Sequence, residues 1–228
     1  MNAIKHEIAF LHTARVHVKT FDMLLARYAP GTSIRHDIDE SLLSDANKLG
    51  LTTAIITRTQ QALTDASSTG ASIVICTCST LGGIAEAFDE SLDAKIMRID
   101  RPMADLAVTL GERVLIVAAL ASTLEPTQKL LQDSANNLNT SPSIDTLLVP
   151  DAWESFLRED LQNYHSLIAT YLDDFNNYPG DTPNLIVLAQ ASMAPAADLC
   201  RRIQVPILSS PTIGITAALN ALHNSAQK

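Results

Sequence analysis

The hydrophobic positions of the chain form short apolar runs separated by longer segments of mixed polarity. Runs with the composition of strands occur at residues 8–11, 33–38, 73–75 and 95–99, and again at 114–118, 144–149, 184–189 and 205–208. Short aliphatic and β-branched runs bounded by turn formers are typical of buried parallel strands. Their regular alternation with other segments predicts an α/β fold.

Apolar residues recur with helical spacing between these runs. The expected helices cover 16–28, 41–49, 53–68, 102–110, 122–138, 194–202 and 212–223, with one long helix or a pair over 153–175 and a loop over 176–183. Gly50, Gly70 and Gly111 follow three of the segments. Glycine is common just beyond a helix end, which supports these boundaries.

The stretch Ala71–Phe88, with the sequence ASIVICTCSTLGGIAEAF, is a strand, a small polar turn and a helix. Cys78 stands at the carboxyl end of the strand, where open α/β sheets bind ligands. A helix that begins near Ser79 is expected to stabilise a thiolate and to lower the thiol pKa from about 8.5. The hydroxyls of Ser79 and Thr80 add ligand-binding groups. The alternative is that Cys78 is a small core residue.

A second strand, turn and helix unit occurs at 184–199, with the sequence NLIVLAQASMAPAADL. Superposed without a gap, it places Gln190 on Cys78 and Ser192 on Thr80, and 114–119 likewise superposes on 8–13. This internal similarity indicates a duplication.

The duplication predicts two pseudo-symmetric Rossmann-like lobes, each with a parallel four-stranded sheet and together enclosing the active site in a cleft. The expected lobes are residues 1–102 plus 207–228, and residues 103–206. The strand ends would face each other across the cleft, where Cys78 and Gln190 would meet.

Other polar residues follow the first strand of each half. His12 and Thr13 end the strand at 8–11, and Ser122 and Thr123 follow its counterpart. All four could hydrogen-bond a substrate carboxylate without a metal. The alternatives are a structural role for His12 and a helix cap at Ser122.

Asp39, Glu40 and Arg101 have simpler interpretations. Asp39 is expected to cap a helix, Glu40 to lie solvated in its first turn, and Arg101 to form a salt bridge in place of binding a carboxylate.

The composition narrows the classes of function. A net charge of −9, a pI of about 5.0 and no basic run disfavour binding to nucleic acid or to an anionic membrane. We find no secretory leader and no apolar stretch near the ~20 residues that span a bilayer. Three cysteines fit a reducing compartment, so a cytoplasmic location is expected.

Familiar cofactor and metal motifs are missing from the sequence. It has eight glycines and contains no G-x-G-x-x-G, P-loop, H-x-x-x-H or paired C-x-x-C pattern. We therefore predict a cofactor-independent enzyme without a metal. Cys76 is expected on the other face of its strand from Cys78, buried and inert, and Cys200 is expected to be unreactive and well along the helix over 194–202.

The two turns resemble the motifs of a known family. Cys78-Ser79-Thr80 is similar to Cys-Asn-Thr, and 189–193, Ala-Gln-Ala-Ser-Met, is similar to Gly-Cys-Ala-Gly-Met. Both motifs belong to the Asp/Glu/hydantoin racemase superfamily. The resemblance implies two lobes and an isomerase that uses two cysteines, one on each side of the substrate's α-carbon.

The chain departs from this pattern at Gln190, because an amide cannot ionise to transfer a proton. Related maleate isomerases use a thiolate nucleophile, and arylmalonate decarboxylases keep only the second cysteine. Cys78 would act alone as acid, base or nucleophile, and Gln190 would donate a hydrogen bond to an enolate or carboxylate oxygen.

Three hypotheses follow. The first is a cofactor-independent, racemase-like isomerase acting on a small carboxylate or related carbonyl compound. The second is a decarboxylase-type carbon–carbon lyase, and the third is a non-catalytic small-molecule binding protein. The sequence leaves the substrate open, and it leaves open whether the protein is a homo-oligomer.

Overall fold

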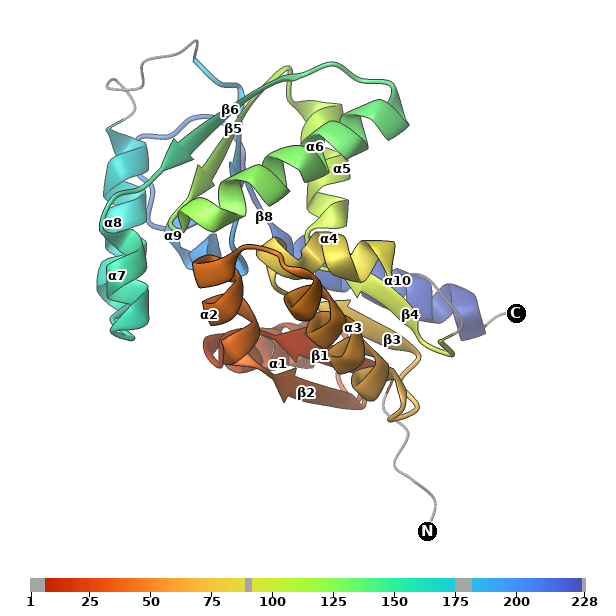
Figure 1. Cartoon of the computed structure of the whole chain (residues 1–228). Helices are drawn as coiled ribbons and strands as arrows, with labels where there is room; N and C mark the ends of the chain where they lie inside the picture. The colour runs from red at the N-terminus through yellow and green to blue at the C-terminus, as the bar shows by residue number, and fades with distance from the viewer. Residues whose placement is uncertain (1–6, 89–91, 175–181, 227–228) are drawn as a thin grey trace. The chain divides into compact units, whose positions relative to one another are not determined.

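The computed structural model describes residues 7–88, 92–174 and 182–226, and the chain divides into two compact units (Figure 1). The first unit is Met1–Asp100 with Pro211–Lys228, and the second is Arg101–Ser210. The sequence-based boundaries were 102 and 206, whereas the structure places them at 100 and 210.

The first unit contains one four-stranded sheet with the order β2-β1-β3-β4, in which every neighbouring pair is parallel. Its elements in chain order are β1 (Ile8–His12), α1 (Val16–Tyr28), β2 (Ile34–Ile38), α2 (Glu40–Leu49), α3 (Thr53–Ser67), β3 (Ile73–Cys76), α4 (Ser79–Ala87), β4 (Lys95–Arg98) and the C-terminal α10 (Ser210–Ala226).

The second unit repeats this arrangement in the sheet order β6-β5-β7-β8, again all parallel. Its elements are α5 (Arg101–Leu110), β5 (Arg113–Ala118), the 3₁₀ turn η1 (Ala121–Thr123), α6 (Leu124–Leu138), β6 (Ser143–Leu148), α7 (Ala152–Leu157), α8 (Leu161–Asp173), β7 (Leu185–Leu188), the 3₁₀ turn η3 (Ala191–Met193), α9 (Ala194–Ala197) and β8 (Ile207–Ser209). The predicted α/β fold with two parallel four-stranded sheets is confirmed.

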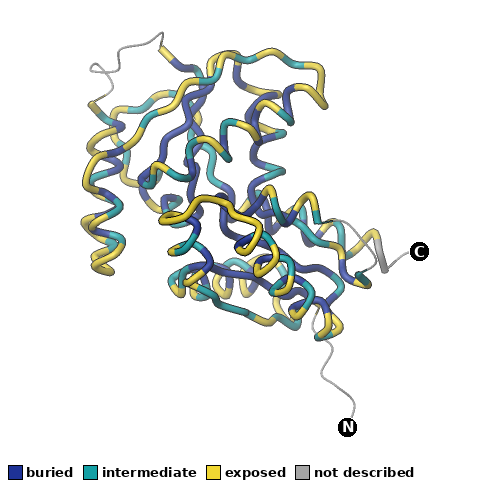
Figure 2. Tube along the Cα trace, in the orientation of Figure 1, coloured by how far each residue is buried: buried dark blue, intermediate teal, exposed yellow. Residues whose placement is uncertain are grey.

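The central strands β1, β3 and β7 are buried along their whole length (Figure 2), as expected where helices cover both sides of a sheet. In the first unit, one core joins α2, α3 and α4 to Ala9, Leu11 and Val74. The other joins α1 and α10 to Phe10 and Ile75. Side chains of a strand alternate between the two sides, so these two cores take alternate residues of β1 and β3.

The duplication is visible in matching backbone hydrogen bonds. The N–H of Thr77 donates to the carbonyl of Leu11 at 3.1 Å, and the N–H of Ala189 donates to the carbonyl of Val117 at 2.9 Å. Cys78 and Gln190 are the next residues, and each caps the helical turn that follows its strand. Gln190 therefore occupies the position in the second unit that Cys78 occupies in the first.

Three local predictions need correction. The segment 153–175 is the pair α7 and α8, broken at Glu159, which has a φ of 61°. The helix expected over 194–202 stops at Ala197. Residues 207–209 form β8, which pairs with β7 and so belongs to the second unit, not the first.

The loop predicted over 176–183 lies largely outside the described residues. Within the described chain, we find no helix with the length and apolar character needed to cross a bilayer.

Candidate active site

Cys78 lies between β3 and α4 as the residue that caps the helix, with extended backbone angles (φ −94°, ψ 114°). Ser79 and Thr80 form the first turn of α4, as the sequence predicted. The Cys78 side chain makes no capping hydrogen bond to α4, but Thr13 and the backbone N–H groups of Leu81 and Thr80 act to lower the pKa of its thiol. Of the candidates in the first unit, Thr13, Ser79 and Thr80 thus gather around the thiol.

The expected low pKa of Cys78 is wrong for this structure. The residue is only 7% exposed, and burial raises the pKa of its thiol above the ordinary value. Thr13 and the backbone N–H groups of Leu81 and Thr80 oppose this effect because they favour the charged thiolate. The helix N-terminus contributes as predicted, but desolvation outweighs it.

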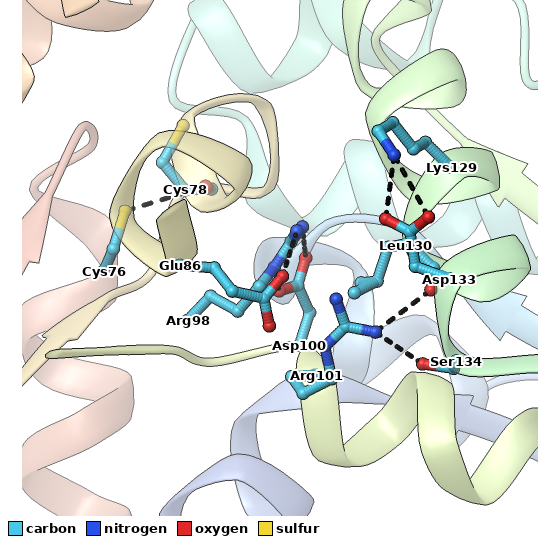
Figure 3. Close-up of polar contacts among 10 residues, drawn as sticks. All are labelled: Cys76, Cys78, Glu86, Arg98, Asp100, Arg101, Lys129, Leu130, Asp133 and Ser134. Atoms are coloured by element: carbon cyan, nitrogen blue, oxygen red, sulfur yellow. Dashed lines mark hydrogen bonds and ion pairs between the residues drawn. The ribbon is translucent and has the colours of Figure 1, made fainter. Parts of the chain in front are cut away.

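Cys76 is buried, as expected, yet it lies on the same side of the sheet as Cys78. Both thiols belong to the core beneath α2, α3 and α4, because residues two apart in a strand point the same way. The Cys76 Sγ donates to the backbone carbonyl of Cys78 at 3.8 Å (Figure 3). Burial raises the pKa of Cys76 to about 12.

A buried ion pair lies behind α4 and was not anticipated from the sequence. The Nε of Arg98 donates to Asp100 at 2.6 Å, and its Nη1 is 3.5 Å from a carboxylate oxygen of Glu86 (Figure 3). A Cβ added at Gly82 would be 2.8 Å from the Arg98 guanidinium, so glycine lets the cation approach the helix backbone.

Replacing Asp100 with asparagine should therefore destabilise the first unit strongly. The substitution leaves the Arg98 cation buried without its main counter-charge, a change that costs about 3–5 kcal/mol in comparable cases. Urea denaturation measures the loss. Asp133→Asn is the control, because its partner Lys129 is 72% exposed and that pair contributes ~0.5 kcal/mol or less. Equal effects of the two substitutions would contradict this role of the ion pair.

Gln190 occupies the matching position in the second unit, with its amide orientation fixed by the backbone. Its Oε1 accepts hydrogen bonds from the N–H groups of Ala119 and Leu120 at 2.7 and 3.1 Å. Both partners are donors only, so the oxygen must face them. The amide NH₂ is left as the group that can donate elsewhere.

The other candidates of the second unit have structural partners. The hydroxyl of Thr123 donates to the carbonyl of Leu120 at 2.6 Å, and Ser122 lies in the same 3₁₀ turn. Ser192 hydrogen-bonds the hydroxyl of Tyr164 at 2.9 Å, and the carbonyl of Ser192 is 2.9 Å from Nε2 of His165. These contacts hold the turns that flank Gln190.

His12 is completely buried and both of its ring nitrogens are engaged. Its Nδ1 lies 2.8 Å from the Thr77 hydroxyl, and its Nε2 lies 2.8 Å from Nδ1 of His36. The structural alternative for His12 fits these contacts better than direct substrate binding.

Asp39 and Glu40 have the simple roles expected for them, a helix cap and an exposed residue of the first turn. Asp39 caps α2 by accepting from the N–H groups of Ser41 and Leu42. Arg101 joins α5 to α6, because its Nη1 donates to Ser134 Oγ at 2.7 Å and to a backbone carbonyl of α6 (Figure 3). Cys200 is half-buried, and burial raises the pKa of its thiol to about 11.

Thr80 is a further candidate to bind a ligand. Its side-chain oxygen is buried and has no hydrogen-bond partner among the described residues, although a buried hydroxyl is normally paired. It lies in the first turn of α4 beside Cys78. No group of three or more His, Cys, Asp or Glu side chains in the described chain is placed to hold a metal ion.

The fold is that of the racemases to which the two turns show a resemblance. The glutamate racemase RacE1 of Bacillus anthracis superposes with a TM-score of 0.68 at 15% identity, covering 98% of this chain and 84% of that one. The aspartate racemase of Picrophilus torridus gives 0.68 at 12% identity, covering 95% and 94%. The allantoin racemase of Klebsiella pneumoniae gives 0.62 at 16% identity, covering 97% and 89%.

These similarities show that the chain shares the fold of these racemases, as predicted. Sequence comparison adds nothing further, since no protein-family model and no curated protein matches the chain.

Proposed function

We propose that the protein is a cofactor-independent isomerase of racemase type that acts on a small carboxylate or related carbonyl compound. The observation that carries the proposal is the thiol of Cys78, placed just after the carboxyl end of β3 at the N-terminus of α4, where Thr13 and two backbone N–H groups favour its thiolate. Solved structures with this fold include glutamate, aspartate and allantoin racemases, which supports the class of reaction.

In the proposed reaction, the Cys78 thiolate removes the proton from the substrate's α-carbon and most often returns one to the same face. The slower inversion occurs when the planar enolate takes a proton from water on the opposite face. The Thr13 hydroxyl and the N–H groups of Thr80 and Leu81 stabilise the thiolate between these steps. Ser79 and the unpartnered hydroxyl of Thr80 are proposed to bind the substrate carboxylate. The Gln190 amide is proposed to donate a hydrogen bond to the enolate oxygen that develops.

A carbon–carbon lyase is the second candidate, because only one of the two equivalent positions carries a thiol. Decarboxylation leaves an enediolate that a single acid can protonate from one face. The Gln190 amide cannot supply a second proton. Product analysis distinguishes the two reactions, since a lyase releases carbon dioxide and an isomerase does not.

The proposal is tested by incubating the protein in D₂O with a panel of small amino, hydroxy and dicarboxylic acids. We expect deuterium at the α-carbon of at least one class, detected by NMR together with chiral analysis. Loss of a carboxyl group without exchange would favour the lyase. Binding of a panel member without exchange or decarboxylation would leave a binding protein and contradict the proposed function.

Limited alkylation should label Cys78 before Cys76 and Cys200. Cys78 lies at the N-terminus of α4, where Thr13 and two backbone N–H groups favour its thiolate, and burial raises the pKa of Cys76 to about 12 and that of Cys200 to about 11. Burial raises the Cys78 pKa, so the thiol form dominates at pH 7 and labelling should rise about tenfold per pH unit up to pH 9. Mass-spectrometric mapping checks this, and first labelling of Cys200 would contradict it.

A further inference from the structure

A chain of four polar side chains connects the protein surface to the residue before Cys78. Asp22 Oδ1 lies 3.1 Å from Nε2 of His36, Nδ1 of His36 lies 2.8 Å from Nε2 of His12, and Nδ1 of His12 lies 2.8 Å from the Thr77 hydroxyl. The Asp22 side chain is 52% exposed, that of His36 is 13% exposed, and His12 is fully buried. The chain joins α1 to β2, β1 and the end of β3.

Hydrogen-bond chemistry gives this chain a direction. An ionised Asp22 can only accept, so Nε2 of His36 must carry a proton. If His36 is neutral, its Nδ1 accepts from Nε2–H of His12, and Nδ1 of His12 then accepts from the Thr77 hydroxyl. Every member is satisfied, because the Leu11 carbonyl beside Thr77 already accepts the backbone N–H of Thr77.

Adding one proton to His36 reverses the rest of the chain. Nδ1–H of His36 now donates to Nε2 of His12, so the single proton of His12 must reside on Nδ1 and donate to Thr77. The Thr77 hydroxyl then turns to the Leu11 carbonyl, 3.3 Å away. His12 remains neutral in both arrangements, because burial and the neighbouring His17 and His36 lower its pKa to about 2.

We propose that Asp22, His36 and His12 are positioning residues that transmit the protonation state of His36 to the hydroxyl of Thr77 and so to the reactivity of Cys78. The inference rests on the proposed role of Cys78, adds Asp22 and His36 to that site and gives His12 a positioning role in it. None of the three touches the substrate. Thr77 acts on Cys78 through the backbone, because it is the residue before Cys78. Its N–H and its hydroxyl both face the Leu11 carbonyl.

Other aromatic and titratable side chains pack around His12 and His36. The ring of Phe10 stacks on both His12 and His36, with centroids 5.4 and 5.1 Å away. From α1, His12 is also faced by His17, 6.0 Å away, whose buried Nδ1 has no hydrogen-bond partner among the described residues. The neighbours of His36 along β2, Arg35 and Asp37, bond each other.

Imidazole ¹⁵N NMR of the intact protein tests the relay. We expect the proton of His12 to move from Nε2 to Nδ1 over the same pH range in which His36 gains its charge, while His12 itself stays neutral. A His12 ring that keeps one tautomer throughout the titration of His36 would overturn the proposal, whatever the activity of the protein.

Substitutions test whether the relay of Asp22, His36, His12 and Thr77 affects the reactivity of the Cys78 thiol. His36→Phe keeps an aromatic ring against Phe10 but removes both nitrogens, so the pH profile of Cys78 alkylation should lose the inflection that matches the His36 titration. Asp37→Asn changes a carboxylate on the same strand outside the relay and should keep that inflection. An inflection that persists in His36→Phe would overturn the proposal.

If His36→Phe does not fold, the imidazole ¹⁵N spectra of the unmodified protein still test the relay. The failure of the proposed function is separable, because an unreactive Cys78 would show in labelling while the His12 tautomer still reports on the relay.

Discussion

Replacing Cys78 with serine is expected to abolish both α-proton exchange and isomerisation. A serine hydroxyl is far harder to ionise near neutral pH than a thiol, so the proposed acid and base is lost. Acid–base groups typically contribute about 10²–10⁴-fold to the rate. The measurement is the rate of deuterium incorporation for the substrate class found in the panel.

Cys200→Ser is the control for this change, because Cys200 is only half-buried and its thiol donates to the backbone carbonyl of Ala196. It should keep its activity within about twofold, as expected for a substitution away from the site. Full activity of Cys78→Ser would show that the thiol mechanism is wrong.

Replacing Gln190 with cysteine is expected to raise inversion relative to exchange by about tenfold or more, since a positioned acid or base contributes 10²–10⁴-fold. The substitution restores the paired-thiol pattern that the racemase resemblance implies. It also releases the N–H groups of Ala119 and Leu120, which now bond the amide oxygen. Chiral analysis of the partly deuterated substrate gives both rates.

Gln132→Cys controls for an added thiol, because Gln132 is exposed on α6. It should leave the ratio of inversion to exchange unchanged. An unchanged ratio in Gln190→Cys as well would mean that position 190 does not supply the second proton in this protein.

Local patterns were sufficient to predict the fold. The apolar runs at 73–75 and 114–118 are strands in the structure, and α1 covers the predicted range. Such runs are informative because both sides of each sheet are covered, so strands and helices differ clearly in composition. The error at 194–202 arose because Ala and Leu favour helix while the chain turns away after Ala197.

The candidate site was predicted in its positions but only partly in its chemistry. Cys78, Thr13 and Thr80 come together because they follow adjacent parallel strands. The thiol pKa was predicted in the wrong direction, because the extent of burial depends on packing that local sequence does not specify. The sequence could have predicted that Cys76 and Cys78 lie on the same side of the sheet, because side chains two residues apart in an extended segment point the same way.

The remaining partners join segments far apart in the chain. Asp22, His36 and His12 meet because β2 pairs with β1 beneath α1, a register that no local motif contains. The orientation of the Gln190 amide likewise depends on backbone donors 71 and 70 residues away. The charged Arg98 at the end of the predicted strand 95–99 was the visible signal of the buried ion pair.

The ratio of α-proton exchange to inversion in the unmodified protein tests the single-thiol account most directly. With Cys78 as the only group that transfers the proton, deuterium should enter with retention of configuration much faster than the substrate inverts. NMR gives the exchange rate and chiral chromatography gives the inversion rate from the same D₂O reaction. Equal rates from the first turnovers would contradict the account, because a second base would then act on the opposite face.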